Sequence, residues 1–352
     1  MRVTIKDVAR QAGVSASTVS LVLNSKPVSI SQGTREAVLA AARELNYRPN
    51  QLAVSLATQK SKTLGLIIPD NSNLFFAHLS KHIENAASQA GYTLIYGNSN
   101  DNVRTDLHYL HIFGDRGVDG IIISPSAFGT PDEYWSCLSF IYSLKLPVVF
   151  VDRPMQESNL PSVLPDNFTG GYLATRHLLD QGHRVIGCCT GPADLGSCIQ
   201  RLNGYRKALE EFGISFNPAL IYHGDFSTES GQKALPYLLG QNVTAVFSFN
   251  DMMAFGLYKE MHSYNLSVPN DLSIVGFDDI FFAEVIQPPL TTIAQPITEI
   301  AEAVVEKLVS QIEHPTQEIS AVPQMFTPVL KVRGSVRRID VNSNKSNNGG
   351  SQ

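Results

Sequence analysis

Eight short apolar runs, whose first residues lie 25 to 37 positions apart, are the strongest constraint that this sequence places on its fold. Each interval has the length of one strand followed by a crossover helix, which is the unit that builds parallel sheets. Because the runs are almost continuously apolar, we expect strands that are buried on both faces. The runs are Leu64–Ile68, Thr93–Tyr96, Gly120–Ile123, Val148–Val151, Val185–Cys189, Leu220–Tyr222, Ala245–Phe249 and Ile274–Phe277.

Eight such strands could close into one barrel or form two open sheets. The longest interval, from Asp152 to Arg184, contains Pro154, Pro161 and Pro165 and favours two halves. Open parallel sheets bind ligands beyond the carboxyl ends of their strands, so two facing sheets leave a cleft between them. We therefore predict an α/β body of two doubly wound parallel sheets with a ligand-binding cleft.

Polar and aromatic side chains follow six of the eight runs. Carboxylates and amides can pair with sugar hydroxyls, and a flat ring such as Phe226 can stack on a sugar ring. Any one of these residues could instead cap a helix or form a turn, so the agreement of six strand ends is the stronger indication. The residues are Asp70, Asn71, Asn73, Phe75, Phe76, Asp152, Arg153, Arg201, Asn203, Tyr205, Asp225, Phe226, Asn250, Asp251, Asp278 and Asp279.

The charges divide the chain into a basic head and an acidic body. Residues 1–60 contain eight basic and three acidic side chains, a net charge of +5, whereas the whole chain carries −5 and the remainder therefore −10. Charge clustering by chance would give a similar picture. A polyanionic partner for the head is the alternative that the local pattern favours.

Three short helices with a tight turn between the first two are predicted in the head. Ile5, Val8, Ala9 and Ala12 form one apolar stripe after Thr4, a suitable N-cap, and Gly13 ends that helix. Ser15 can cap a second helix, and a third follows. The stripes are Val19, Val22 and Leu23 in the second helix, and Val38, Ala41, Ala42 and Leu45 in the third. This is the helix-turn-helix arrangement, whose second helix enters the major groove of DNA.

The outward face of the second helix carries Ser17, Ser20, Leu21 and Asn24. Hydroxyls and an amide suit contacts with phosphates and base edges. Leu21 could be a lone exposed leucine of the kind that any surface carries. If the chain binds DNA, we expect Leu21 to contact the methyl group of a thymine.

The head resembles the N-terminal signature of the LacI/GalR family of bacterial transcriptional repressors. The resemblance rests on the contiguous run from Thr4 to Ser20 and on the segment Leu45–Asn50. It implies that Ala16, Ser17 and Leu21 occupy base-reading positions. Most members carry arginine where this chain has Leu21, so the operator sequence cannot be transferred from relatives.

The segment after Pro49 is predicted to be a short hinge helix, because Leu52, Ala53 and Leu56 follow a helical pattern behind an asparagine. By itself it could be a plain tether. The resemblance implies instead that it folds on the operator and that Leu56 wedges into the minor groove. The head and hinge residues expected at the DNA are Thr4, Ser15, Ala16, Ser17, Thr18, Ser20, Leu21, Asn24, Asn50, Ala53 and Leu56.

The body is similar to the effector-binding core of the same family, itself similar to periplasmic sugar-binding proteins. The matching segments run from Gly65–Asp70 to Pro289–Ile293, and the resemblance extends to about Val336. It implies that the chain crosses between the two halves near Thr291–Ile293 and again near Thr327. The positions that match effector contacts are Phe75, Asp152, Arg201, Phe226, Asn250 and Asp278.

Several classes of protein are not supported by the sequence. Four cysteines make no disulfide or metal framework, and no apolar stretch approaches the roughly 20 residues of a membrane span. Common phosphate, zinc and hydrolase motifs are missing, and the pairs His78/His82 and His108/His111 have no further ligands at suitable spacing. We therefore expect no cofactor and no metal, a location in the cytoplasm, and no enzymatic activity.

The sequence thus predicts a ligand-responsive repressor that binds a palindromic operator as a homodimer. A sugar is the expected effector, and a purine is the alternative, since phenylalanine stacks on bases as readily as on sugars. The rival functions are a plain small-molecule binding protein and an α/β enzyme that carries a basic head, and a corepressor-dependent regulator with a purine-type ligand is a further alternative. The polar tail lacks the leucine heptads that join some relatives into tetramers.

The expected domains are a helix-turn-helix head (1–48), a hinge (49–62), an effector and dimerisation domain (63–338) and a disordered tail (339–352). Within the effector domain, the N-subdomain is expected at about 63–161 and 293–325, and the C-subdomain at about 162–292 and 326–338.

Overall fold

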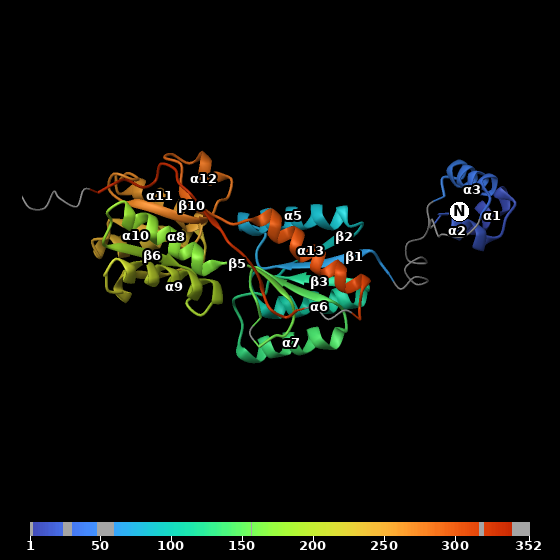
Figure 1. The fold of residues 1–352 in the computed structure, drawn as a ribbon, viewed down its shortest axis with the longest axis horizontal. Coiled ribbons are helices and arrows are strands. Elements are labelled where there is room, and N and C mark those ends of the chain that lie inside the picture. The colour runs from blue at the N-terminus through green and yellow to red at the C-terminus, as the bar shows by residue number, and fades with distance from the viewer. Residues whose placement is uncertain (1–2, 24–29, 48–59, 156, 317–319, 340–352) are drawn as a thin grey trace, which may run out of the picture. The chain divides into compact units, whose positions relative to one another are not determined.

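The structure, a computed structural model, describes residues 3–23, 30–47, 60–155, 157–316 and 320–339. The chain divides into two compact units, Met1–Lys62 and Thr63–Gln352, each of which is described by itself. Figure 1 labels their helices and strands.

The first unit contains α1 (Ile5–Ala12), α2 (Ala16–Leu23) and α3 (Gln32–Glu44) around a small core. The buried residues Val8, Val19, Val22 and Val38 come from all three helices. Each predicted stripe is therefore on the inner side of its helix.

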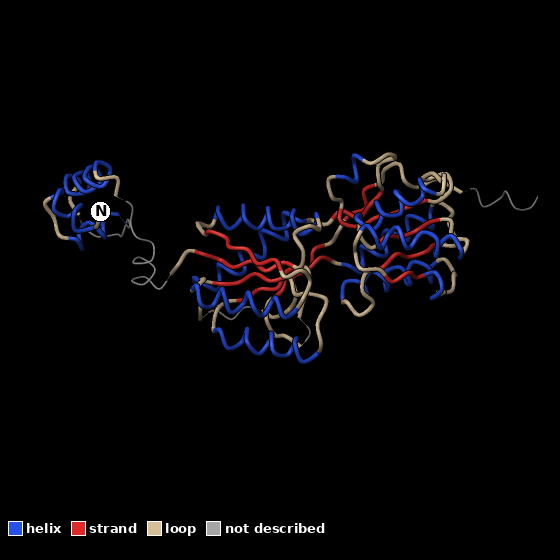
Figure 2. The backbone as a smooth tube through the Cα atoms, turned by 180° about the vertical axis from the view of Figure 1, so that it is seen from behind, coloured by secondary structure: helices blue, strands red, loops and turns tan. Residues whose placement is uncertain are grey.

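The second unit contains two six-stranded sheets, each flanked by helices on both faces (Figure 2). The strand order in the first sheet is β11-β5-β4-β3-β1-β2. All the pairings in this sheet are parallel. Its strands are β1 (Thr63–Ile68), β2 (Thr93–Asn98), β3 (Gly120–Ile123), β4 (Val148–Val151), β5 (Ser162–Pro165) and β11 (Gln324–Phe326).

Two pairs of helices bury the faces of the first sheet. One core joins α5 (Leu74–Gln89) and α13 (Ile297–Glu313) to one face, and another joins α6 (Val103–Arg116) and α7 (Pro131–Leu144) to the other. The carboxyl ends of its strands are thereby left as the polar edge.

The second sheet repeats this plan in the order β12-β10-β9-β8-β6-β7. Only β12 runs antiparallel to its neighbour β10. The strands are β6 (Ile186–Thr190), β7 (Ile221–His223), β8 (Ala245–Ser248), β9 (Ser273–Asp278), β10 (Thr291–Ala294) and β12 (Val329–Lys331). Their helices are α8 (Asn167–Asp180), α9 (Gly196–Glu211), α10 (Thr228–Gly240), α11 (Asp251–Ser263) and the short α12 (Phe282–Val285), with a 3-10 turn at Pro218–Leu220.

All eight predicted strands are present, and four further strands were not predicted. Because β5 pairs with β4 in the first sheet, the chain passes to the second sheet after Pro165, a few residues beyond the expected boundary at 161. It returns after Ala294 and crosses a third time after Phe326, in place of the expected 292 and 325. The sequence signal of β5 is weak because the strand is short and ends in proline.

Helices α8 and α9 pack closely on each other. Gly171 of α8 and Gly204 of α9 permit this approach, since a methyl group at Gly171 would overlap the backbone carbonyl of Arg201, and one at Gly204 that of Phe168. Both obstacles are backbone atoms, which cannot rotate away.

We expect Gly171→Ala to lower the free energy of unfolding by about 1–3 kcal/mol, the usual cost of overpacking. The matched control is Gly240→Ala at the end of α10, where an added methyl group meets nothing within 4 Å. Thermal and urea unfolding of both variants measure the difference. Equal stability of the two variants would contradict the role given to the α8–α9 contact.

Candidate functional site

The start of α1 is held by a reciprocal pair of residues. The backbone N–H and the hydroxyl of Thr4 donate to Asp7 Oδ2 at 2.9 and 2.7 Å. These hydrogen bonds, the side-chain one first, lower the pKa of Asp7. Gly13 ends the helix at φ 66°. Thr4, expected at the DNA, therefore has its hydroxyl proton already engaged by Asp7.

In α2, Ser15 is the cap and the two buried valines are the anchor. Ser15 Oγ accepts the backbone N–H of Thr18 at 3.1 Å, and the two hydroxyls lie 2.9 Å apart. Ser17 is exposed, and Ser20 is half-buried. α2 thus presents serine at its outer surface, as predicted.

Two of the residues expected to read bases, Ala16 and Leu21, are not fully exposed. Ala16 packs partly against the core of the head, whereas Leu21 is half-buried and, among the described residues, is not one of those packed on that core. Four of the residues expected at the DNA lie outside the described part of the chain: Asn24, Asn50, Ala53 and Leu56.

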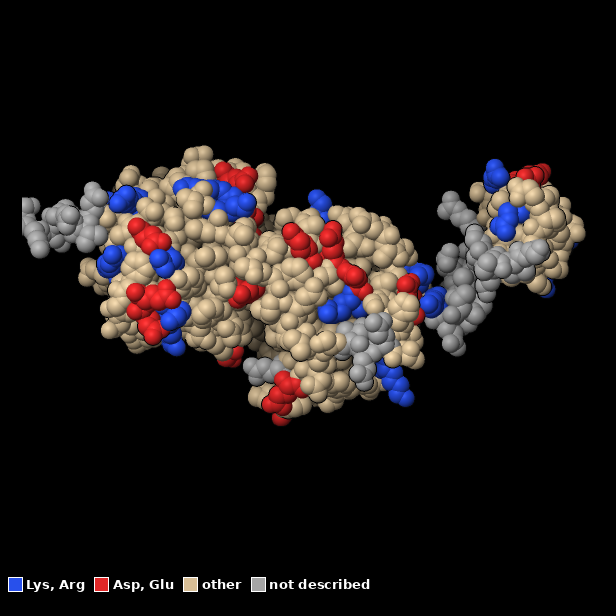
Figure 3. All heavy atoms as spheres, in the orientation of Figure 1, with Lys and Arg blue, Asp and Glu red and all other residues tan. Residues whose placement is uncertain are grey.

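Basic side chains lie at the surface of the head (Figure 3). Lys6, Arg10 and Arg43 are exposed and Arg35 is half-buried. The head therefore offers cations for phosphate contacts near a helix that carries short polar groups.

In the second unit, one cleft at the strand ends brings together all six residues that match effector contacts. Four further residues line it and were not among the six: Asn73, Phe76, Arg153 and Ser197. Asn73, Phe76 and Arg153 are among the strand-end residues named from the sequence, whereas Ser197 was not predicted.

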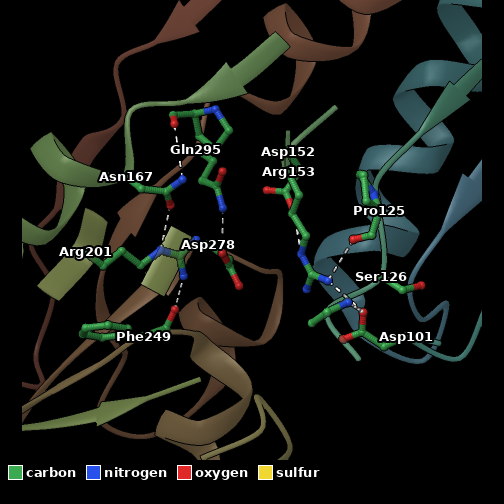
Figure 4. A network of polar contacts seen from close by, with 12 residues as sticks. Asp101, Pro125, Ser126, Asp152, Arg153, Asn167, Arg201, Phe249, Asp278 and Gln295 are labelled. Carbon is green, nitrogen blue, oxygen red and sulfur yellow. Dashed lines mark hydrogen bonds and ion pairs between the residues drawn. The ribbon is translucent and has the colours of Figure 1, made fainter. Parts of the chain in front are cut away.

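Arg201 of α9 is the centre of one side of the cleft (Figure 4). Its Nε donates to Asn167 Oδ1 at 2.8 Å, and one terminal nitrogen donates to the carbonyl of Phe249. The guanidinium carbon lies 3.5 Å from the centre of the Phe277 ring. Although burial lowers the pKa of Arg201, Asp278 and other anionic groups oppose that shift.

Asp278 ends β9 on the same side of the cleft and has an unusual backbone, with φ of 114°. The amide of Gln295 donates to Asp278 Oδ1 at 2.8 Å. Burial raises the pKa of Asp278 to about 7, and the charge of Arg201 partly opposes this rise. The cleft therefore favours the protonated form of this carboxyl group more than water does.

Arg153 organises the opposite side (Figure 4). One terminal nitrogen donates to Asp101 Oδ1 at 2.8 Å and to the carbonyl of Pro125 at 3.3 Å, and its Nε lies 3.6 Å from Asp152 Oδ2. Burial raises the pKa of Asp152, and the charge of Arg153 is the largest opposing effect. Asp152 follows β4 at φ 65°.

The aromatic rings and Asn250 complete the lining. Phe75 and Phe76 begin α5 behind the Asn73 cap. Phe226 has φ of 69°, and its ring lies against Gly191, where no side chain would fit. Asn250 accepts the N–H of Met253 at 2.9 Å and donates to the carbonyl of Phe226 at 2.9 Å, and these bonds fix its orientation in the cleft.

This arrangement suits the binding of a small polar ring compound. Charged and amide groups approach from both sheets, and aromatic rings cover the apolar surface. Within the described ranges, no group of three or more histidine, cysteine or acidic residues could hold a metal ion. No helix there is long and apolar enough to cross a membrane.

Comparison with known proteins connects the head and the body to two families. Residues 4–50 match bacterial regulatory proteins of the lacI family, and residues 175–336 match a periplasmic binding protein-like domain. The HTH-type transcriptional repressor PurR of Photobacterium profundum is 37% identical over 96% of this chain and 99% of its own length.

Two solved structures are similar over nearly the whole chain. A lac repressor dimer bound to operator and the anti-inducer ONPF is 28% identical, with a TM-score of 0.84 over 96% of this chain and all of its own. A complex of the transcriptional regulator CelR with cellobiose is 30% identical, with a TM-score of 0.71 over 95% of this chain and all of its own.

The titration of Asp278 gives a prediction for the protein without ligand. Its carboxyl group binds a proton more tightly when folded, with a pKa of about 7 against an ordinary 3.8. Its contribution to stability therefore falls as pH rises from about 4 to 7. We expect Asp278→Asn, which cannot ionise, to become more stable relative to the unsubstituted chain over this range. Unfolding midpoints measured at several pH values test this, and parallel curves for the two proteins would exclude it.

Proposed function

This chain belongs to the LacI family of bacterial regulatory proteins, and we propose how it recognises DNA and its effector. It is a ligand-responsive, DNA-binding transcriptional repressor. The observation that carries this function is the presence of both parts, a helix-turn-helix head and a two-sheet binding body, along the full length of a named repressor.

α2 is the recognition helix of the proposal. Exposed Ser17 and the neighbouring Leu21 are the residues that we expect to reach base edges, while Ser15 and Thr4 serve mainly as caps. Two copies of the chain would place two such helices in successive major grooves of a palindromic operator. Leu56, outside the described residues, is proposed as the minor-groove wedge at the centre.

The cleft of the second unit is the proposed effector site. Charged, amide and aromatic side chains of both sheets line it, which supports a small polar ligand. Carboxylates, a guanidinium and an amide beside aromatic rings suit a sugar, our first choice. A nucleobase is the second, because Phe75 and Phe226 offer flat surfaces to either.

We propose that the arrangement of the two halves of the body, each built on one sheet, controls DNA binding. The effector contacts residues of both halves, so it binds best in one arrangement of the halves and shifts the population toward it. Operator affinity measured with and without ligand shows the direction of control. A fall in affinity identifies the ligand as an inducer, and a rise identifies it as a corepressor.

We further propose that the chain works in the cytoplasm, where an operator would be found, and that it catalyses no reaction. The charged groups of the cleft support the second point, since Arg201, Asp278 and Arg153 are held by protein partners. Side chains that are fixed in this way can bind a ligand in one orientation without taking part in a reaction.

We expect Leu21→Arg to change the preferred half-site toward guanine, because arginine pairs bidentately with guanine in the major groove. Each such pair contributes about 1–3 kcal/mol of discrimination. A selection from randomised operators reads the preference directly. The control, Gln32→Arg at the start of α3, adds the same charge, and it should raise affinity without a new base preference. If Leu21→Arg selects the same half-site as the unsubstituted chain, Leu21 does not contact the bases. If the unsubstituted chain enriches no sequence at all, the proposed mode of DNA binding is wrong.

A thermal-shift screen with monosaccharides, disaccharides and nucleobases should identify the effector, since a ligand that binds the folded state raises the melting temperature. We expect Phe226→Leu to lower the affinity for the ligand identified in the screen by about tenfold, which corresponds to about 1.4 kcal/mol of lost stacking. Phe168→Leu, a substitution of an exposed ring that does not line the cleft, serves as the control. If both variants bind as the unsubstituted chain does, the effector binds elsewhere.

A further inference from the structure

Two histidines meet on α5, outside the cleft. His78 and His82 are four residues apart and therefore lie on the same side of the helix. Their Nε2 atoms are 3.1 Å apart, and their ring centres are 4.7 Å apart with planes inclined at 72°. The two rings thus converge at their tips.

A neighbouring helix holds one of these rings. His82 Nδ1 lies 3.3 Å from the hydroxyl of Thr298 on α13. When Nδ1 carries the proton and donates it to this hydroxyl, the lone pair of His82 is on Nε2 and faces His78. Metal-binding histidines are oriented in the same way, with the second ring nitrogen donating to a hydrogen-bond partner.

The spacing of the two nitrogens also suits coordination. With Zn–N bonds of about 2.0–2.1 Å and tetrahedral angles, two ligand nitrogens are about 3.3 Å apart. The observed 3.1 Å needs only a small rotation of the rings. His78 is exposed and His82 half-buried, so an ion can enter and keep water as its remaining ligands.

We propose that His78 and His82 form a two-histidine site for a divalent transition-metal ion of the Zn²⁺ type. Imidazole nitrogen selects Zn²⁺, Cu²⁺ and Ni²⁺ over Mg²⁺ and Ca²⁺, which take oxygen ligands. No third histidine, cysteine or acidic residue joins the pair in the described ranges, so the affinity is below that of four-ligand structural sites.

The electrostatic setting of His78 is consistent with this site. Burial first, and then the nearby charges of His82 and Lys81, lower the pKa of His78. Lys81 is the neighbouring cation that opposes a bound metal.

The test uses the full chain without a histidine tag and Zn²⁺ alone, measured by titration calorimetry. We expect one ion per chain, and loss of that binding in the double variant His78→Asn/His82→Asn. The matched control is His108→Asn/His111→Asn on α6. There, His111 stacks on Phe140 with ring centres 3.8 Å apart, and His108 lies beside Tyr109. This control should bind as the unsubstituted chain does.

Two further measurements distinguish this site from general binding by surface histidines. Thr298→Val should lower the affinity for Zn²⁺ by about tenfold, since loss of such an orienting partner lowers metal affinity by about 10–100-fold. Paramagnetic resonance of bound Cu²⁺ should report two nitrogen ligands, reduced to one by His82→Asn alone. Unchanged Zn²⁺ affinity in the His78/His82 double variant, or equal binding of Mg²⁺, would overturn the proposal.

Discussion

The buried guanidinium of Arg201 is the interaction on which the effector body depends. A buried charge is tolerated only when it has hydrogen-bond partners. Here Asn167 of α8 and the carbonyl of Phe249 after β8 each accept a hydrogen bond from the guanidinium, and the ring of Phe277 in β9 lies against it. Three elements that are distant in sequence are therefore joined at one side chain. The glycine contacts between α8 and α9 bring α9 close enough for this to occur.

Three residues that line the same cleft have a strained backbone. Asp152, Phe226 and Asp278 are non-glycine residues at positive φ; Asp152 follows β4, Phe226 lies in the loop after β7, and Asp278 ends β9. Such conformations cost free energy and persist only where surrounding contacts determine them. Arg153 beside Asp152, Asn250 beneath Phe226 and Gln295 on Asp278 supply those contacts. The cleft is thus preorganised before any ligand enters.

Local patterns were sufficient to predict the helices of the head and eight strands, and the resemblance to the LacI/GalR family supplied the six cleft residues. They did not predict β5, β10, β11 or β12, whose order depends on pairing with neighbouring strands in the sheet. Nor could they find the partners of Arg153: Asp101 is 52 residues away, and the pair forms only when two loops of the first sheet meet. Gln295 was missed for the same reason, since its role depends on where the second crossing passes.

The two hydrogen bonds of Asn250 have a consequence for molecular discrimination. Its oxygen accepts the N–H of Met253 at the start of α11, and its amide nitrogen donates to the Phe226 carbonyl. Both contacts fix the orientation of the carboxamide, so its donor and acceptor atoms cannot exchange places. A guest compound that reaches this group must therefore match a fixed order of hydrogen-bonding atoms, and an outline of the right size alone is not enough.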